Sequence, residues 1–282
     1  MILIADSGST KTEWSLVGRN GVERTFRTAG INPYLLGEDE VRRILTREVL
    51  VELPIERITE VYFYGAGCVG RPAETLCVQL HRVIGPETVE VNSDLLAAAR
   101  ALCGDAPGIV AILGTGSNSG YYDGRDITRR VPSLGFLLGD EGSGSDLGKH
   151  LLADALKGLL PEPLARQFFD CYPLTQEEVL DAVYRRPMPN RYMARFSPFI
   201  HEHLDDPYLH RLVSTRFEAF FRRNILAYPS QGCPVHLVGS VAYHYADLLR
   251  EVARSLSIEV GTILSSPGKA LAQYHAGRIS EQ

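Results

Sequence analysis

The sequence has few of the features that mark secreted, metal-rich or membrane proteins. Its five cysteines are scattered and form no Cys-x-x-Cys pair, which argues against a disulfide framework and against a zinc site. No apolar run approaches the roughly 18 residues that a membrane span needs. The first residues, MILIADSGST, carry no basic residue, and their apolar run ends at Asp6, so no signal peptide is expected. These absences predict a cytoplasmic protein with no membrane partner.

An excess of basic residues is also lacking. Lys and Arg number 29 against 34 Asp and Glu, and the formal net charge of −5 argues against a nucleic-acid partner. The eight histidines show no metal-binding spacing. What remains is the composition of an ordinary globular enzyme, with 45% hydrophobic residues and 26 glycines. A chain of 282 residues predicts one large or two medium domains.

The strongest positive signal is a repeated succession of short strands and small-residue turns. The apolar run at residues 2–5 leads into the turn DSGSTK, a strand pattern at 13–17 and the hairpin signal Asn20-Gly21. Roughly 108 residues later, the run at 109–113 leads into the turn GTGSN, a strand pattern at 119–122 and the hairpin signal Asp123-Gly124. This repetition indicates an internal duplication, which predicts α/β halves at 1–105 and 106–282.

Helical and strand patterns fill the rest of both halves. Periodic apolar residues predict helices at 39–51, 73–84 and 95–102, and a mostly helical stretch from 145 to 228 in which Thr175 opens a capping box. Strands are predicted at 61–64, 89–91 and 235–238, the last followed by a helix through residue 256. No low-complexity linker is present. Whether the C-terminal helix at 269–279 packs on the first half is left open.

The first small-residue turn has the parts of a phosphate site. Small residues allow backbone N–H groups to approach an anion, and hydroxyl groups and a lysine add further donors. The residues concerned are Gly8, Ser9, Thr10 and Lys11. Asp6, at the strand end, is suited to hold Mg²⁺ through water. The turn is not a Walker A loop, because a strand and not a helix follows it. The alternative reading is a plain hairpin with polar turn residues.

Two further junctions extend the phosphate hypothesis. The turn at Thr115 and Gly116 stands on the equivalent strand of the second half, so that the two turns would clamp the β- and γ-phosphates of a nucleotide from opposite sides of a cleft. Asn118 is the polar residue of this turn best suited to reach a second substrate. Gly239 and Ser240 join a strand end to a helix start, where a flat ring or a phosphate can approach the backbone. Such junctions are also common structural features of α/β proteins.

The ordered set of these motifs carries a family resemblance. The turns DSGSTKT and GTGSN, the triplet Asn92-Ser93-Asp94, the segment GDEGSG at 139–144 and the segment VGSV together resemble the N-acetylglucosamine kinases. These belong to the BadF/BadG/BcrA/BcrD-type ATPases of the actin/hexokinase/Hsp70 superfamily. The likeness covers nearly the whole chain. It implies two RNase H-like (actin-like ATPase) domains with ATP and Mg²⁺ in the interdomain cleft, a homodimer, and transfer of the γ-phosphate to the 6-hydroxyl of N-acetylglucosamine or a related amino sugar.

The resemblance also implies roles for single residues. Asp94 matches the catalytic base, as phosphoryl transfer needs a carboxylate to orient and deprotonate the hydroxyl. The structural alternative for Asp94 is the N-cap of the following helix. Thr115 matches an ATP contact. Sugar contacts are implied for four residues, which are Asn32, Ser117, Asn118 and Asp140. Asn32 is also ordinary in a loop before proline, and Asp140 has a helix cap as its alternative, a role for which Glu141 and Ser143 compete.

One departure from the family pattern leaves the sugar open. Where some members have Gly-Trp-Gly before the GDEGS segment, this chain has Leu134-Gly135-Phe136. The acceptor is therefore N-acetylglucosamine, N-acetylmuramic acid, glucosamine or another amino sugar. Two other functions are weighed: an activator ATPase of 2-hydroxyacyl-CoA dehydratases, which would need cysteines for a shared [4Fe–4S] cluster, and a non-catalytic sugar or nucleotide sensor.

Overall fold

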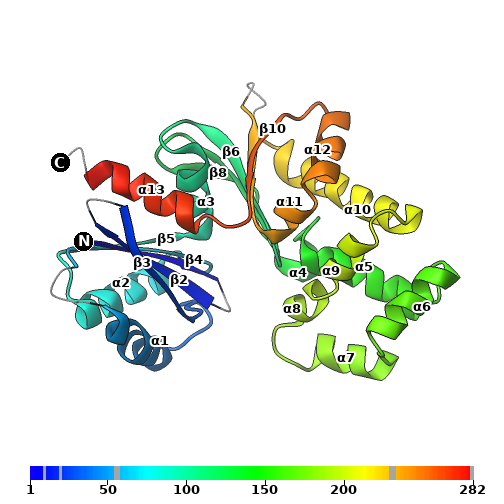
Figure 1. Ribbon diagram of the computed structural model, residues 1–282, viewed down its shortest axis with the longest axis horizontal. Helices are drawn as coiled ribbons and strands as arrows, with labels where there is room; N and C mark the ends of the chain where they lie inside the picture. Colours follow the sequence, from blue (N-terminus) through cyan, green and yellow to red (C-terminus); the bar gives the residue numbers. More distant parts are fainter. Residues whose placement is uncertain (9–10, 19–20, 54–57, 229–232, 280–282) are drawn as a thin grey trace. The chain divides into compact units, whose positions relative to one another are not determined.

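The structure, a computed structural model, describes residues 1–8, 11–18, 21–53, 58–228 and 233–279 (Figure 1). Internal contacts divide it into two compact units. The first comprises Met1–Ala106, Gly124–Ile127 and Ser266–Gln282, and the second comprises Pro107–Asp123 and Thr128–Ser265. In the described part of the chain, no helix is long and apolar enough to cross a membrane.

A five-stranded mixed sheet forms the centre of the first unit. Its strands are β1 (Ile2–Ser7), β2 (Lys11–Gly18), β3 (Gly21–Ala29), β4 (Glu60–Gly65) and β5 (Thr88–Ser93), in the order β3-β2-β1-β4-β5. β1 pairs antiparallel with β2 and parallel with β4, while β2–β3 is antiparallel and β4–β5 parallel. The expected hairpin between β2 and β3 is confirmed by the pair Gly18 and Gly21, although Asn20 itself lies outside the described residues.

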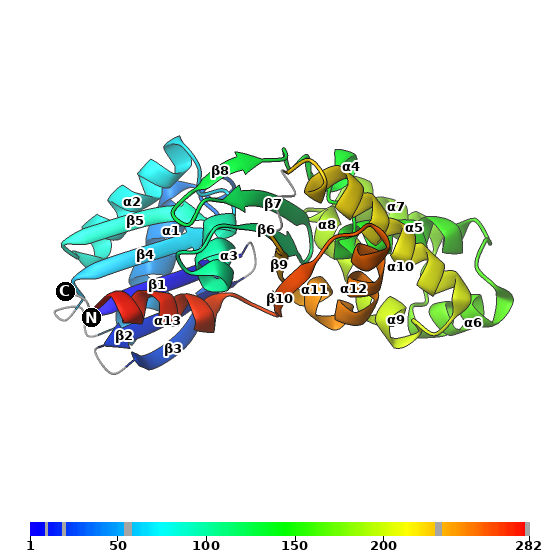
Figure 2. The ribbon, with the colours of Figure 1, turned by 90° about the horizontal axis from the view of Figure 1, so that it is seen from above.

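Helices cover both faces of this sheet. α1 (Glu38–Ile44), continued by η1 (Leu45–Val49) and η2 (Leu50–Glu52), and α2 (Arg71–Ile84) lie on one face, while α3 (Asp94–Cys103) and α13 (Gly268–Ile279) lie on the other (Figures 1 and 2). The core is built around the fully buried Trp14, which stacks on Phe26 and meets Phe63 edge-on. The C-terminal helix α13 contacts β1, β2, β3 and α3, all of which belong to this unit.

The second unit repeats the strand arrangement. β6 (Gly108–Leu113), β7 (Ser117–Tyr122), β8 (Ile127–Arg130), β9 (Val235–Val238) and β10 (Val260–Leu264) form a sheet in the order β10-β9-β6-β7-β8. β6 pairs antiparallel with β7 and parallel with β9, which is the environment of β1 in the first sheet. The predicted duplication is thus confirmed at the level of topology, and each sheet has the RNase H-like order.

The helices of the second unit confirm the mostly helical middle of the chain. They are α4 (Gly135–Leu138), α5 (Gly144–Leu156), α6 (Glu162–Cys171), α7 (Gln176–Tyr184), α8 (Pro189–Ala194), α9 (Ser197–Glu202), α10 (Pro207–Phe220) with its continuation η4 (Phe221–Ile225), α11 (Ser240–His244) and α12 (Ala246–Ser255). The capping box at Thr175 is present, with Thr175 and Glu178 each accepting the other's backbone N–H. The single helix expected at 240–256 was wrong, since it is interrupted at Tyr245.

Strand β10 was not predicted from the sequence. A register shift between Val260 and Ile263 disturbs its pairing with β9, and such a bulge interrupts the alternation of apolar and polar residues. Gly261 lies within the strand because the ring of His236 on β9 occupies the space of a side chain, 2.7 Å from where its Cβ would be.

A buried histidine ties α13 to the first sheet. His275 is only 3% exposed, its ring lies 4.1 Å from that of Tyr62, and its Nε2 is 2.8 Å from the Tyr64 hydroxyl. Arg100 of α3 donates to the same hydroxyl, so the Tyr64 proton is directed at His275, which must be neutral to accept it. Burial, with the charges of Arg100 and Arg278, lowers the pKa of His275 to about 3.

This lowered pKa predicts a specific acid sensitivity. Below about pH 6.5 the unfolded chain binds a proton at His275, whereas the folded protein keeps His275 neutral. The contribution of neutral His275 to the unfolding free energy is therefore complete above pH 6.5 and is lost as the pH falls towards about 3. We expect His275→Phe to lose less unfolding free energy between pH 7 and pH 5 than the parent, measured by urea unfolding. His81→Phe, on the exposed side of α2, is the matched control. An unchanged pH slope in His275→Phe would contradict the assignment.

Candidate active site

The first unit holds the turn that the sequence assigns to phosphate. The turn leaves β1 after Ser7, and the Gly8 N–H donates to the Lys11 carbonyl at 3.0 Å. Lys11 is exposed at the first position of β2. Ser9 and Thr10, which were predicted to contribute donors, lie outside the described residues.

Asp6 stands at the carboxyl end of β1, opposite Glu13 of β2. Burial raises its pKa to about 7, with further contributions from the negative charges of Asp94 and Glu13, while Lys11 acts in the opposite direction. A half-buried carboxylate that is repelled by its neighbours is a group that a cation would stabilise, and such perturbed groups gather at functional sites.

Asp94 lies close enough to Asp6 to influence it, so the structure brings these two predicted residues together. Asp94 is the first residue of α3, and its Oδ1 accepts the Leu95 N–H at 2.8 Å. The N-cap is Ser93, whose hydroxyl accepts the Leu96 N–H at 3.3 Å. The alternative reading of Asp94 as the N-cap is therefore wrong, because the residue before it fills that role.

Asn32 is held in the same unit, after β3. Its side chain is 8% exposed, and its Oδ1 accepts the Tyr34 N–H at 3.0 Å. The preceding residue is anchored by the turn itself, since the Ile31 N–H donates to the hydroxyls of Ser7 and Thr12. Ser7 and Thr12 were not singled out from the sequence, because the contact joins residues 19 and 24 positions apart in the chain.

The second turn is held by the start of α5. Its Gly114 N–H donates to Gly116, and its carbonyls at Gly114 and Thr115 accept the N–H groups of Gly144 and Ser145, at 2.8 and 3.0 Å. Ser117 and Asn118 belong to β7 and not to the turn as expected. The Asn118 Oδ1 accepts the N–H of Ser119.

Asp140 lies against this turn. It is 9% exposed, has a left-handed backbone (φ 57°), and accepts the Ser117 N–H through Oδ1 at 3.1 Å. A Cβ at Gly116 would lie 3.0 Å from Asp140 Oδ2, so a side chain there would push the Asp140 carboxylate by a few tenths of an ångström. Burial raises the pKa of Asp140, opposed by the Ser117 hydrogen bond. The cap of α5 is Ser143, which accepts the Asp146 N–H, so the cap reading of Asp140 is wrong.

Asp146 supports the 139–144 segment and was missed as a supporting residue. Its side chain is 1% exposed, and its Oδ2 accepts from the Gly142 N–H at 2.9 Å and from Arg216 Nε at 2.7 Å. Burial raises its pKa, but hydrogen bonds from His150 and Arg216 outweigh burial and lower the pKa to about 2. The sequence offered one signal for this residue, because Asp146 stands three residues after Ser143 in a run of small residues.

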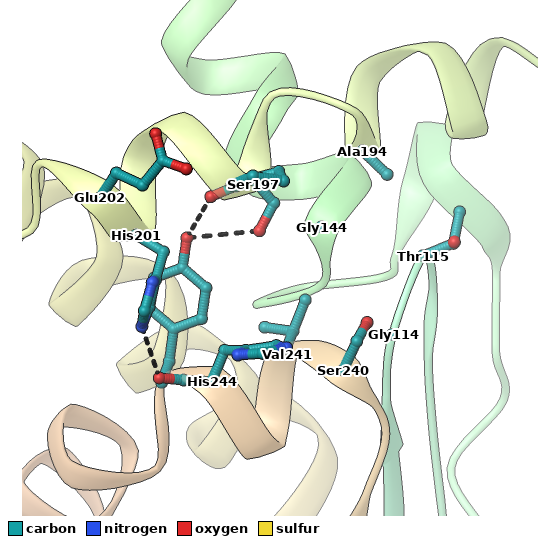
Figure 3. Close-up of a pocket in the computed structure, with 12 residues that line it drawn as sticks. Gly114, Thr115, Gly144, Ala194, Ser197, His201, Glu202, Ser240, Val241 and His244 are labelled. Atoms are coloured by element: carbon teal, nitrogen blue, oxygen red, sulfur yellow. Dashed lines mark hydrogen bonds between the residues drawn. The ribbon is translucent and has the colours of Figure 1, made fainter. Parts of the chain in front are cut away.

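A pocket of about 370 Å³ opens within the second unit (Figure 3). Ser197, Pro198, His201 and Glu202 of α9 form one wall and α11 with Tyr245 forms the other, while Gly114, Thr115, Gly144 and Ala194 close its end. The Tyr245 hydroxyl donates to the Ser197 carbonyl at 2.6 Å, and His201 Nε2 donates to the His244 carbonyl at 2.9 Å. Apolar walls with a few fixed polar groups are typical of a site for a flat ring.

Of the residues of the second unit that were predicted to bind the nucleotide, some line this pocket and others do not. Thr115 and Ser240 line it, whereas Gly116 and Gly239 do not. Gly239 has a packing reason of its own, because a Cβ there would lie 2.2 Å from the Leu113 carbonyl oxygen, and its φ is +128°. Ser240 is the first residue of α11, as expected, but this helix is only five residues long.

Among the residues with described positions, no group of three or more His, Cys, Asp and Glu side chains is arranged to hold an ion. Mg²⁺ bound with phosphates and water needs only one or two carboxylates, so Asp6 with its raised pKa fits that mode of binding.

Comparison with known proteins gives strong structural matches and no others. No protein-family model and no curated protein matches the chain. A solved structure named "putative N-acetylglucosamine kinase", from Porphyromonas gingivalis, is 45% identical, covers 99% of this chain and 100% of its own, and has a TM-score of 0.95. A protein of the same name from Chromobacterium violaceum is 19% identical over 97% of this chain and 98% of its own, with a TM-score of 0.77.

A more distant match extends the fold assignment. A ROK family glucokinase from Streptomyces griseus, in complex with glucose and AMPPNP, is 15% identical over 98% of both chains, with a TM-score of 0.56. At this identity the likeness concerns the fold alone, which is that of two actin-like ATPase domains. The 45% identity over the full length carries more: this chain belongs to the N-acetylglucosamine kinase family.

Proposed function

We propose that the protein is an ATP-dependent sugar kinase that transfers the γ-phosphate of ATP to the 6-hydroxyl of N-acetylglucosamine or a related amino sugar. The observation that carries the proposal is the 45% identity, over 99% of this chain, to the protein named "putative N-acetylglucosamine kinase". The paired carboxylates of the first unit and the pocket of the second support it. No specific observation favours the activator or the sensor function. The homodimer and the cytoplasmic location inferred from the sequence stay predictions.

Asp94 is the catalytic base in this proposal. Its carboxylate accepts the proton of the sugar hydroxyl, whose oxygen forms a bond to the γ-phosphorus while the bond to the β,γ-bridging oxygen breaks and its electron pair leaves with ADP. Its place at the first position of α3, with Ser93 serving as the cap, supports this role. Asp6 is the residue that would hold Mg²⁺, which neutralises phosphate charge when bound.

The nucleotide lies in the second unit. The pocket between α9 and α11 takes the base, and Thr115 and Ser240 at its inner end reach the ribose or the phosphates. Gly116 and Gly239 act through the backbone, by allowing the turn and the strand end to pack closely. On the first unit, Gly8, Ser9, Thr10 and Lys11 bind phosphate.

The acceptor sugar is bound by Asn32, Ser117, Asn118 and Asp140. Asp140 already accepts one backbone N–H and offers its other carboxylate oxygen to sugar hydroxyls. The segment before it differs from the family pattern at Leu134–Phe136, and Leu134, Leu137 and Leu138 are exposed. We place the choice between amino sugars in this segment.

We expect Mg²⁺-ATP turnover, followed by coupled ADP release, to be stimulated by one amino sugar of a panel of N-acetylglucosamine, N-acetylmuramic acid, glucosamine and glucose. Asp94→Asn should lower kcat about 100- to 10,000-fold, the usual contribution of a general base, while ADP affinity in calorimetry stays within about twofold, because Asp94 is not a nucleotide ligand. If no sugar stimulates the parent, the kinase function is refuted. If Asp94→Asn retains full kcat, another residue is the base.

Neighbouring carboxylates allow a matched test of the acceptor site. Asp140→Asn should raise the sugar KM at least tenfold, with the ATP KM little changed, because the amide oxygen keeps the Ser117 N–H and the NH₂ that replaces the second oxygen cannot accept from a sugar hydroxyl. Glu141→Gln is the control, since Glu141 accepts from Arg223 and Asn224 and not from the turn. Equal effects of the two substitutions would show that Asp140 acts through loop structure and not through the sugar.

A further inference from the structure

The loop between β4 and α2 lies directly against the side chain of Asn32. Gly67 in this loop has φ +76°, and a Cβ built there would lie 2.2 Å from Asn32 Oδ1 and 2.9 Å from Tyr34 Cβ. Asn32 has little room to yield, because its Oδ1 is held by the Tyr34 N–H and its carbonyl accepts the N–H groups of Leu35 and Leu36. No side chain fits at position 67 while Asn32 keeps this conformation.

The other side of the Asn32 segment is fixed by two buried hydroxyls. Ser7 and Thr12, 2% and 0% exposed, lie 2.7 Å apart across the ends of β1 and β2. Ser7 donates to the Ile31 carbonyl at 2.9 Å, and the Ile31 N–H donates back to both hydroxyls, at 3.0 and 3.2 Å. The backbone before Asn32 is therefore bonded to the same strands that carry the phosphate turn.

These contacts determine which group Asn32 can offer to a ligand. Its amide oxygen accepts the Tyr34 N–H, which fixes the orientation of the amide and therefore of the NH₂ group with its two N–H donors. In this orientation the NH₂ is the group that we expect to donate to an oxygen of the acceptor. A shift of the side chain by even a fraction of an ångström would misdirect that donor, because hydrogen bonds weaken steeply away from linear geometry.

We propose that Gly67, together with the Ser7–Thr12 hydroxyl pair, is a positioning element that holds the Asn32 amide as a donor to the acceptor sugar. The proposal rests on the proposed function, which makes Asn32 a sugar ligand, and it deepens that function by adding three residues that act through Asn32. None of the three needs to touch the sugar.

Gly67→Ala tests the proposal, with Gly70→Ala as its matched control. Both glycines have positive φ, +76° and +57°, so both substitutions carry backbone strain, but a Cβ at Gly70 meets no atom within 4 Å. We expect Gly67→Ala to raise the sugar KM about tenfold, as the loss of one good hydrogen bond does, and to leave the ATP KM within about twofold. Gly70→Ala should leave both constants near those of the parent. Equal sugar KM values in the two variants would overturn the proposal.

Two further measurements separate positioning from general damage. In an Asn32→Ala background, Gly67→Ala should raise the sugar KM no further, because the side chain that it displaces is already gone. Thr12→Val should raise the sugar KM, and Thr12→Ser should restore it, since the serine keeps the hydroxyl. Additive effects of Asn32→Ala and Gly67→Ala, or failure of Thr12→Ser to restore binding, would contradict a role through Asn32.

The outcomes also distinguish this inference from the function on which it rests. If the parent shows no sugar-stimulated ADP release, the proposed function fails and the inference fails with it. If the parent is active and Asn32→Ala weakens sugar binding while Gly67→Ala does not, the kinase function stands and the positioning role alone is refuted.

Discussion

Close packing of backbone at the carboxyl ends of the central strands is the constraint on which the candidate site residues of each unit depend. In the second unit, Gly239 brings the end of β9 so near to β6 that a Cβ would lie 2.2 Å from the Leu113 carbonyl oxygen. Gly116 makes the corresponding room for the Asp140 carboxylate, and Gly67 of the first unit makes it for the Asn32 amide. These contacts restrict the Asn32 and Asp140 side chains within their loops, and such preorganisation favours recognition and catalysis.

The buried and half-buried carboxylates separate into two kinds according to their partners. Asp146 has a guanidinium and a backbone N–H within hydrogen-bonding distance, and its pKa is lowered to about 2, so it stays ionised and supports its loop. Burial raises the pKa of Asp6 and of Asp140, because neither has a cationic partner strong enough to outweigh the loss of solvent. A carboxylate left in this state gains most from a ligand, whether a cation or a row of hydroxyls.

Local signals predicted much of the fold, and contacts distant in sequence account for most of what was missed. The duplicated strand–turn–strand pattern gave the two sheets, and Thr175 with Glu178 marked the start of α7, because these signals lie within a few residues of each other. Strand β10 was missed because a bulge and Gly261 break its alternation. The break at Tyr245 was missed because the apolar spacing continues through it.

The candidate sites show the same division. The place of Asp6 at a strand end selected it, and the family resemblance selected Asp94 and Asp140, but for these two the residues alone left a helix cap open as the alternative. The structure excludes the cap alternative, because Ser93 and Ser143 are the caps. The roles of Ser7, Thr12 and Gly67 were out of reach, because each depends on a partner 19 to 35 residues away in the chain.

The duplication also explains why one half alone does not suffice for the proposed reaction. The two copies share a strand order but differ in their candidate functional residues. The predicted base on α3 and the predicted metal ligand on β1 lie in the first copy, whereas every residue that lines the 370 Å³ pocket belongs to the second. The turn after β6 carries no carboxylate. In the first copy, by contrast, Asp6 stands at the end of β1, just before the turn. Each copy has therefore kept what the other lacks. The proposed phosphoryl transfer thus assigns the base and the metal ligand to one copy and the nucleotide pocket to the other, while the two copies share one strand order.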